Sequence, residues 1–260
     1  MPNLSRPLII YFALVLCLTF GTQCAAQQAL NTPTSADISN VVPLATLEWP
    51  PYSSKTLPGG GETVAKVREV FNRMGYVAHI DFLPWSRAVR SSKGEYPLYL
   101  GYFPEYPLDD AQFILSASIG TSLLGLAQHK KRRLYLTNTL SLTRYKLGVV
   151  QDYVNTKQID RLIANGTLKP VVAINDRQNL VRVLNGDIDA AVIDKKVMHY
   201  LLQHDEQLRL HAAEQLEFND TLAEAISLHI AFNRYHYDAG LSQRFNQTLL
   251  QMDNETQLKP

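Results

Sequence analysis

The stretch Asn185-Gly186-Asp187-Ile188-Asp189-Ala190-Ala191-Val192-Ile193-Asp194 (NGDIDAAVID) decides the fold. Glycine is typical of the position just past a helix end, so a helix is predicted to stop before Gly186. Apart from Asp189, residues 188–193 are apolar and partly β-branched, which is typical of a buried strand. Asp194 follows the strand and can cap a further helix over 195–203. The stretch therefore predicts a helix–strand–helix unit.

The same alternation extends outward from this stretch in both directions. Asp176 is placed to cap the helix that ends at Gly186, and that helix carries apolar residues at helical spacing. Further strands are predicted over 41–49, 77–83, 98–103, 146–150 and 171–174, with helices over 62–74, 85–92 and 156–164. Strands that alternate with helices indicate an α/β protein with mostly parallel sheets.

Two apolar segments without helical period divide this pattern into two lobes. Residues 122–127 and 225–232 are predicted to be crossover strands that form a two-strand hinge. A final helix with Leu241, Phe245, Leu249 and Met252 is expected to pack back on the first lobe. The prediction is two mostly parallel sheets, with residues 41–124 plus 229–260 as a discontinuous lobe 1 and 125–228 as an inserted lobe 2.

The N-terminus resembles an export signal. Arg6 precedes an apolar run over 7–20, and Cys24-Ala25-Ala26 offers small residues for cleavage. We predict a signal peptide over 1–26, cleaved after Ala26, and a mobile segment over 27–40; an uncleaved anchor or a lipid on Cys24 are the alternatives. Cleavage removes both cysteines, so the exported chain has no disulfide, and we expect a periplasmic location.

Composition and motif spacing exclude several classes of function. The 260 residues carry 25 Lys+Arg and 24 Asp+Glu, so no basic surface for nucleic acid is expected. The sequence has no nucleophile elbow, no zinc-protease spacing among its seven histidines and no Lys after its glycine run at 59–61. We therefore expect no cofactor, no metal and no enzymatic activity, and we expect a monomer.

Ligands of two-lobed α/β proteins bind between the lobes, at the carboxyl ends of strands. Aromatic side chains there would enclose a small solute, an arginine would hold a carboxylate, and a carboxylate would hold an ammonium group. Each residue also has a purely structural alternative, as a core residue, a solvated side chain or a helix cap. The candidates that follow predicted strands are Glu48, Trp49, Tyr52, Trp85, Arg87, Tyr102, Asp152, Tyr153 and Asp194.

Together these motifs resemble the bacterial extracellular solute-binding proteins of family 3, the amino-acid-type periplasmic binding proteins. The similarity lies in Leu47-Glu48-Trp49-Pro50-Pro51-Tyr52, in the Pro-Trp-x-Arg motif at 84–87 and in residues 185–194. The resemblance implies a type II-like periplasmic-binding-protein fold that closes about its hinge on a small polar solute. It also implies that Asp194 holds a ligand ammonium group, and that the partner is a transport permease or a membrane sensor.

Two departures from the family pattern leave the ligand class open. The segment 104–110 lacks the family's carboxylate-binding arginine, and Asp152-Tyr153 replaces its Gly-Thr. Either Arg87 replaces that arginine, or acids such as Asp152 and Asp194 favour a cationic amine. Two other functions remain as alternatives: an enzyme on this scaffold with Glu48 as its acid/base, and an accessory regulator that acts by protein contact.

Overall fold

The computed structural model describes residues 40–236 and 239–257. The predicted signal peptide, its cleavage site and nearly all of the segment 27–40 lie outside the described residues. Within the described part of the chain, no helix is long and apolar enough to cross a membrane.

The N-terminal lobe is built on three parallel strands. β1 (Val41–Thr46) lies between β2 (Val77–Phe82) and β3 (Gly101–Glu105), and Leu44 aligns with both Ile80 and Gly101. The helices of this lobe are α2 (Glu62–Arg73), α3 (Trp85–Ser91) and the C-terminal α8 (Ala239–Gln257), with a 3-10 turn η1 (Pro58–Gly60) before α2. Phe71 of α2 contacts Phe245 of α8 with ring centroids 5.0 Å apart, so the end of the chain returns to the lobe where it began.

The C-terminal lobe repeats this arrangement. β6 (Leu147–Val150) lies between β7 (Val171–Ala173) and β8 (Ala190–Asp194), and all three are parallel. Gly186 adopts a left-handed conformation (φ 82°) directly after α5, which ends that helix as the sequence predicts. The helices of this lobe are η2 (Thr139–Arg144), α4 (Lys157–Ala164), α5 (Asp176–Asn185), α6 (Lys195–His204) and α7 (Glu206–His211).

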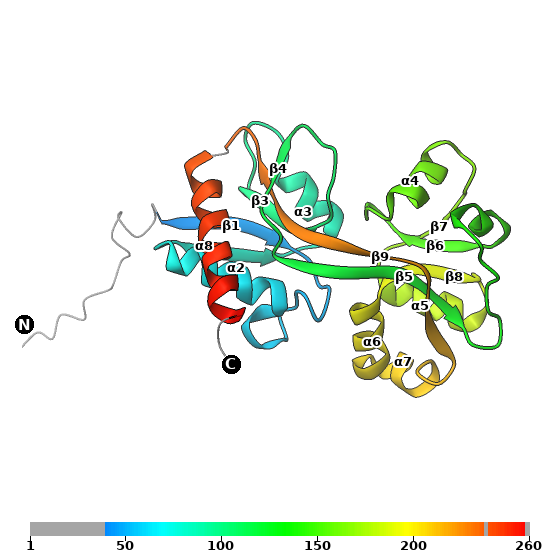
Figure 1. Ribbon diagram of the computed structural model, residues 1–260. Helices are drawn as coiled ribbons and strands as arrows, with labels where there is room; N and C mark the ends of the chain where they lie inside the picture. Colours follow the sequence, from blue (N-terminus) through cyan, green and yellow to red (C-terminus); the bar gives the residue numbers. More distant parts are fainter. Residues whose placement is uncertain (1–39, 237–238, 258–260) are drawn as a thin grey trace, which may run out of the picture.

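Two long antiparallel strands join the lobes (Figure 1). β5 (Gly120–His129) and β9 (Leu216–Asn233) pair along their length, from Gly120 opposite Leu228 to His129 opposite Leu216. β9 also pairs with β3 and with β4 (Phe113–Leu115), while β5 pairs with β8. The predicted two-lobed α/β fold with a two-strand hinge is confirmed, and the sheets merge through these strands in the order β2-β1-β3-β9-β5-β8-β6-β7. The exact residue boundaries of the lobes stay a prediction.

Several local predictions were wrong. The first strand, predicted over 41–49, ends at Thr46, and the second crossover strand, predicted over 225–232, begins at Leu216. The third strand begins at Gly101 and ends at Glu105, three and two residues later than predicted, and Leu98 is exposed. Asn175, not Asp176, caps α5: its side chain accepts a hydrogen bond from the backbone N–H of Gln178. Asp176 therefore occupies the first helical turn, where its carboxyl group is left for other contacts.

Candidate functional site

The cleft between the lobes has two openings. One has a volume of ≈420 Å³ and is lined by Glu48, Lys55 and Trp85 from the N-terminal lobe and by Asn175 from the C-terminal lobe. The other has a volume of ≈310 Å³ and reaches from Glu48 to Asp176. Tyr153 lines both, so the openings form the mouth of one inter-lobe site, with each lobe supplying one wall.

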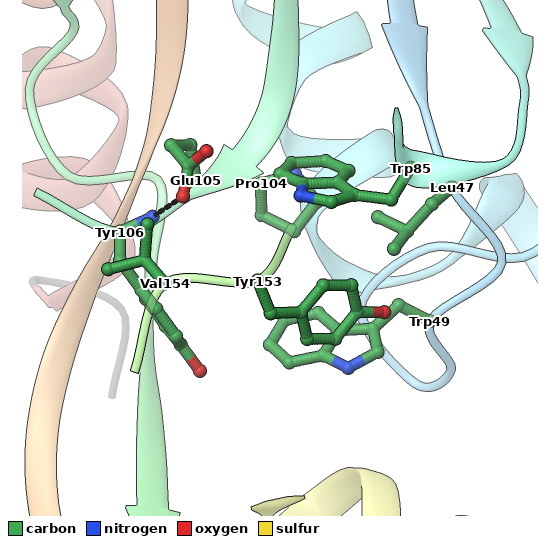
Figure 2. Close-up of a pocket in the computed structure, with 8 residues that line it drawn as sticks. All are labelled: Leu47, Trp49, Trp85, Pro104, Glu105, Tyr106, Tyr153 and Val154. Carbon is green, nitrogen blue, oxygen red and sulfur yellow. Dashed lines mark hydrogen bonds between the residues drawn. The ribbon is translucent and has the colours of Figure 1, made fainter. Parts of the chain in front are cut away.

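Behind the mouth lie two small spaces, which we call the inner cavities, with volumes of ≈20 Å³ and ≈10 Å³. The larger has room for about one water molecule. Trp49, Tyr106 and Tyr153 line both cavities. Trp85 joins them in lining the larger one, as Figure 2 shows. These four side chains are here called the aromatic cage.

Ring contacts hold the cage in place. Trp49 stacks on Tyr52 with centroids 4.6 Å apart and meets the edge of Tyr106 at 6.4 Å. Trp85 meets Tyr153 of the other lobe at 6.0 Å, nearly perpendicular. Perpendicular and offset arrangements are the favoured geometries for aromatic pairs. The cage is therefore a packed structure that spans both lobes.

Two buried carboxyl groups border the cage. Glu105, at the end of β3, is 5% exposed and accepts a hydrogen bond of 2.8 Å from the backbone N–H of Tyr106 (Figure 2). Burial raises the pKa of Glu105 to about 8, although the N–H of Tyr106 and the hydroxyl of Tyr102 lower it in part.

Asp176 is the second of these groups and lines the smaller inner cavity. Burial raises its pKa to about 7, the nearby Trp49 indole lowers that pKa, and the charge of Asp194 raises it. The indole N–H of Trp49 is buried but makes no hydrogen bond of ordinary geometry with any described residue. The Asp176 carboxyl group and the Trp49 indole N–H are therefore polar groups at this end of the cleft that could bond to a ligand.

Asp194 has a different environment, because its oxygens are already used. Its Oδ1 accepts from the backbone N–H of Val197 at 2.9 Å and caps α6. Its Oδ2 lies 2.6 Å from the hydroxyl of Ser122, 3.1 Å from the backbone N of Leu123 and 3.0 Å from the hydroxyl of Tyr52. This carboxylate acts mainly as a structural link between strand, helix and lobes.

Direct bonds join the lobes across the cleft. The indole N–H of Trp85 donates to the backbone carbonyl of Asp152 at 3.0 Å, and the hydroxyl of Ser86 donates to the Asp152 carboxylate. Lys196 and Glu62 form an exposed ion pair of 2.7 Å. Together with the Tyr52–Asp194 hydrogen bond, these contacts hold the described conformation closed.

The structure brings part of the predicted site together. Trp49, Trp85 and Tyr153 lie in the cage, and exposed Glu48 lies at the mouth. Tyr52 and Tyr102 lie behind the cage; Tyr102 packs against Trp85 at 5.2 Å. Arg87 is exposed on α3 and is not among the residues that line the mouth or the inner cavities.

Sequence reasoning missed Glu105, Tyr106 and Asp176. The signal for the first two was present, because both follow the third strand at its carboxyl end. Among the described residues that line the inner cavities there is no Lys, Arg or His. No group of three or more His, Cys, Asp or Glu in the described ranges could hold a metal ion.

No family model and no curated protein sequence matches this chain. Solved structures do match. A histidine kinase sensor domain described as similar to periplasmic binding proteins has a TM-score of 0.69 at 16% identity, over 84% of this chain and 92% of that chain. An ancestral arginine-binding protein bound to arginine has a TM-score of 0.66 at 13% identity, over 84% of this chain and 94% of that one.

A further match is an ABC uptake transporter substrate-binding protein from Streptococcus pneumoniae with bound histidine. Its TM-score is 0.65 at 14% identity, over 84% of this chain and 89% of that chain. At these identities the likeness concerns the fold. The chain has the two-lobed α/β fold of the periplasmic binding proteins.

Proposed function

We propose that this chain is a non-enzymatic binding protein that holds a small polar solute, amino-acid-like or a cationic amine, in the inter-lobe cleft. The observation that carries the proposal is the aromatic cage, because both lobes contribute to it and it lies directly behind an open mouth. Rotation of the lobes about β5 and β9 would open the cage to solvent and close it on the solute.

The compared structures support the same conclusion, since solute-binding proteins and a sensor domain share this fold. We further propose a periplasmic location and a membrane partner, either a transport permease or a sensor protein. A closed form presents a surface that an open form lacks, which is how such a partner would recognise the loaded state.

A thermal-shift screen of the purified protein tests this function. The panel holds amino acids, amines, dicarboxylates, short peptides and muropeptides. A solute that binds only the native state stabilises it by about 2.7 kcal/mol at a hundredfold excess over Kd. A shift with one class supports the proposal. Cooperative melting without a shift in any class contradicts it.

One observation favours a second candidate, a regulator that acts by protein contact. The inner cavities measure only ≈20 Å³ and ≈10 Å³ because the chain's own side chains fill them. A regulator of this kind would retain its partner in pull-down experiments when Trp85→Ala removes one of the four side chains of the cage. The enzyme alternative has less support, because exposed Glu48 lacks the burial that tunes a catalytic carboxyl group.

A further inference from the structure

We propose that the solute carries a primary ammonium group and no α-carboxylate, and that this group lies in the aromatic cage between Glu105 and Asp176. The inference rests on the function proposed above and names the ligand class of the same site.

The only ionisable carboxyl or basic side chains that line the inner cavities, among the described residues, are acidic. Glu105, Asp176 and Asp194 line the inner cavities, and the described lining residues include no basic side chain. Burying a carboxylate without a cation is costly, so buried acids are normally paired. A bound cation would supply the missing partner, whereas a carboxylate would meet only like charge.

Only two of the three acids have capacity for a ligand. Asp194 is engaged by Ser122, Tyr52 and backbone N–H groups. Glu105 accepts hydrogen bonds from its chain neighbours Tyr106 and Tyr102, and no described side chain forms an ion pair with Asp176.

Aromatic faces and size narrow the class further. A cation over the faces of Trp and Tyr is attracted by the ring quadrupoles, most strongly where water is excluded. The larger inner cavity of ≈20 Å³ matches a water-sized group. A primary ammonium group has this size, whereas a trimethylammonium group is several times larger. The rest of the solute would extend into the ≈420 Å³ mouth.

The basic residues nearby are engaged or face solvent. Arg177 at the mouth donates from Nε to Asp205 at 2.6 Å and from its NH2 group to Gln207 at 2.9 Å. Arg87 is exposed on α3. Lys55 lines the ≈420 Å³ opening of the mouth and neither inner cavity. A carboxylate on the carbon that bears the ammonium group would therefore meet no described cation in the inner cavities.

The groups that face the two acids are uncharged or already occupied. Tyr102, Tyr106 and Tyr153 surround Glu105, and the pKa of each hydroxyl is raised by burial. His229 lies opposite Glu105 on β9, but its ring nitrogens contact the carbonyl of Ser116 and the hydroxyl of Ser227. Asp176 faces Trp49 and Asp194. An entering cation should therefore displace protons from Glu105 and Asp176.

The test is calorimetric titration of the intact protein with n-butylammonium. The comparison probes are n-butyltrimethylammonium (larger head), n-butyrate (anion), 1-butanol (neutral) and L-norvaline (α-carboxylate added). We expect n-butylammonium to bind tightest and to bind more tightly as pH rises from 6 to 8.5, by up to about tenfold per unit for each proton released. Titrations in buffers of different ionisation enthalpy would show that proton release directly, without any variant.

Variants locate the site. Glu105→Gln and Asp176→Asn should each weaken n-butylammonium binding about tenfold or more, while Asp253→Asn, which removes a surface ion pair with Lys66, should not. Tighter binding of the trimethylated, anionic or α-carboxylate probe overturns the ligand class but leaves the proposed function standing. Absence of binding by every probe and every class in the thermal-shift panel overturns both. If Glu105→Gln or Asp176→Asn fails to fold, the pH dependence and proton release of n-butylammonium binding to the wild type decide whether the proposal stands.

Discussion

Removal of the Tyr52 hydroxyl should open the cleft without disturbing the cage. In Tyr52→Phe the ring keeps its stack on Trp49, but the hydrogen bond to Asp194 across the lobes is lost. A hydrogen bond to a charged group contributes about 1.5–3 kcal/mol. Each 1.4 kcal/mol is a factor of ten, so the ratio of open to closed protein should rise about 10- to 100-fold.

The indole N–H of Trp85 reports this opening, because it donates across the cleft to Asp152. The sequence has two tryptophans, so two indole signals suffice for the measurement by NMR hydrogen exchange. Exchange of the Trp85 indole should accelerate about 10- to 100-fold in Tyr52→Phe. The control is Tyr99→Phe, which loses a comparable 2.9 Å bond to Asp81 within the N-terminal lobe. Equal exchange rates in both variants and the wild type would refute the idea that the Tyr52–Asp194 hydrogen bond holds the lobes together.

Three further predictions concern stability and closure. The pKa of Glu105 is raised to about 8, so between roughly pH 4.5 and 8 the folded state holds a proton that the unfolded state has lost. The free energy of unfolding should therefore fall as pH rises through this range. Urea titrations should show that Glu105→Gln reduces this fall by on the order of a few kcal/mol. Gly61→Ala should lower the unfolding free energy by about 2 kcal/mol more than Gly166→Ala, because both have positive φ but only at Gly61 would a Cβ lie 2.6 Å from a backbone oxygen. Lys196→Met breaks an exposed ion pair with Glu62 and should change Trp85 indole exchange less than tenfold, with a smaller effect still at high salt.

The sequence was sufficient to predict the order of most helices and strands, although it gave no sign of β4 or α7. Apolar runs and glycine stops placed β8 and the end of α5, and the absence of helical period at 122–127 and 225–232 identified the crossover strands. These signals are local, so a single chain displays them. The merging of both sheets through β5 and β9 depends on long-range pairing, which no local pattern specifies.

The site was harder to predict because it depends on single-residue register. The predicted third strand ended at Phe103, which put Tyr102 at the cleft; the observed strand runs to Glu105 and has a shift in register between Tyr102 and Glu105. A shift of one residue moves a side chain to the other face of a sheet. Tyr102 therefore packs behind Trp85, and Glu105 borders the cavity.

Capping decided the roles of the C-terminal acids in the same way. Asp194 follows its strand as the sequence predicts, but capping α6 uses one of its oxygens and the lobe contact uses the other. Asn175 caps α5 instead of Asp176, which leaves the Asp176 carboxyl group beside Trp49. Which of two adjacent residues caps a helix depends on a backbone angle at one position, and sequence alone fixes that angle poorly.

Closure and ligand affinity are coupled through the Tyr52–Asp194 bond, and the sign of the coupling separates two mechanisms. If n-butylammonium enters only the open form, its apparent Kd equals the intrinsic Kd divided by the open fraction. Tyr52→Phe would then tighten binding by the factor by which it accelerates Trp85 exchange. If the ammonium group is instead held by the closed cage, with Glu105 beside the larger inner cavity and Asp176 beside the smaller one, the same variant would weaken binding. Because both acids are buried in the closed conformation, we expect the second case, in which Tyr52→Phe weakens n-butylammonium binding.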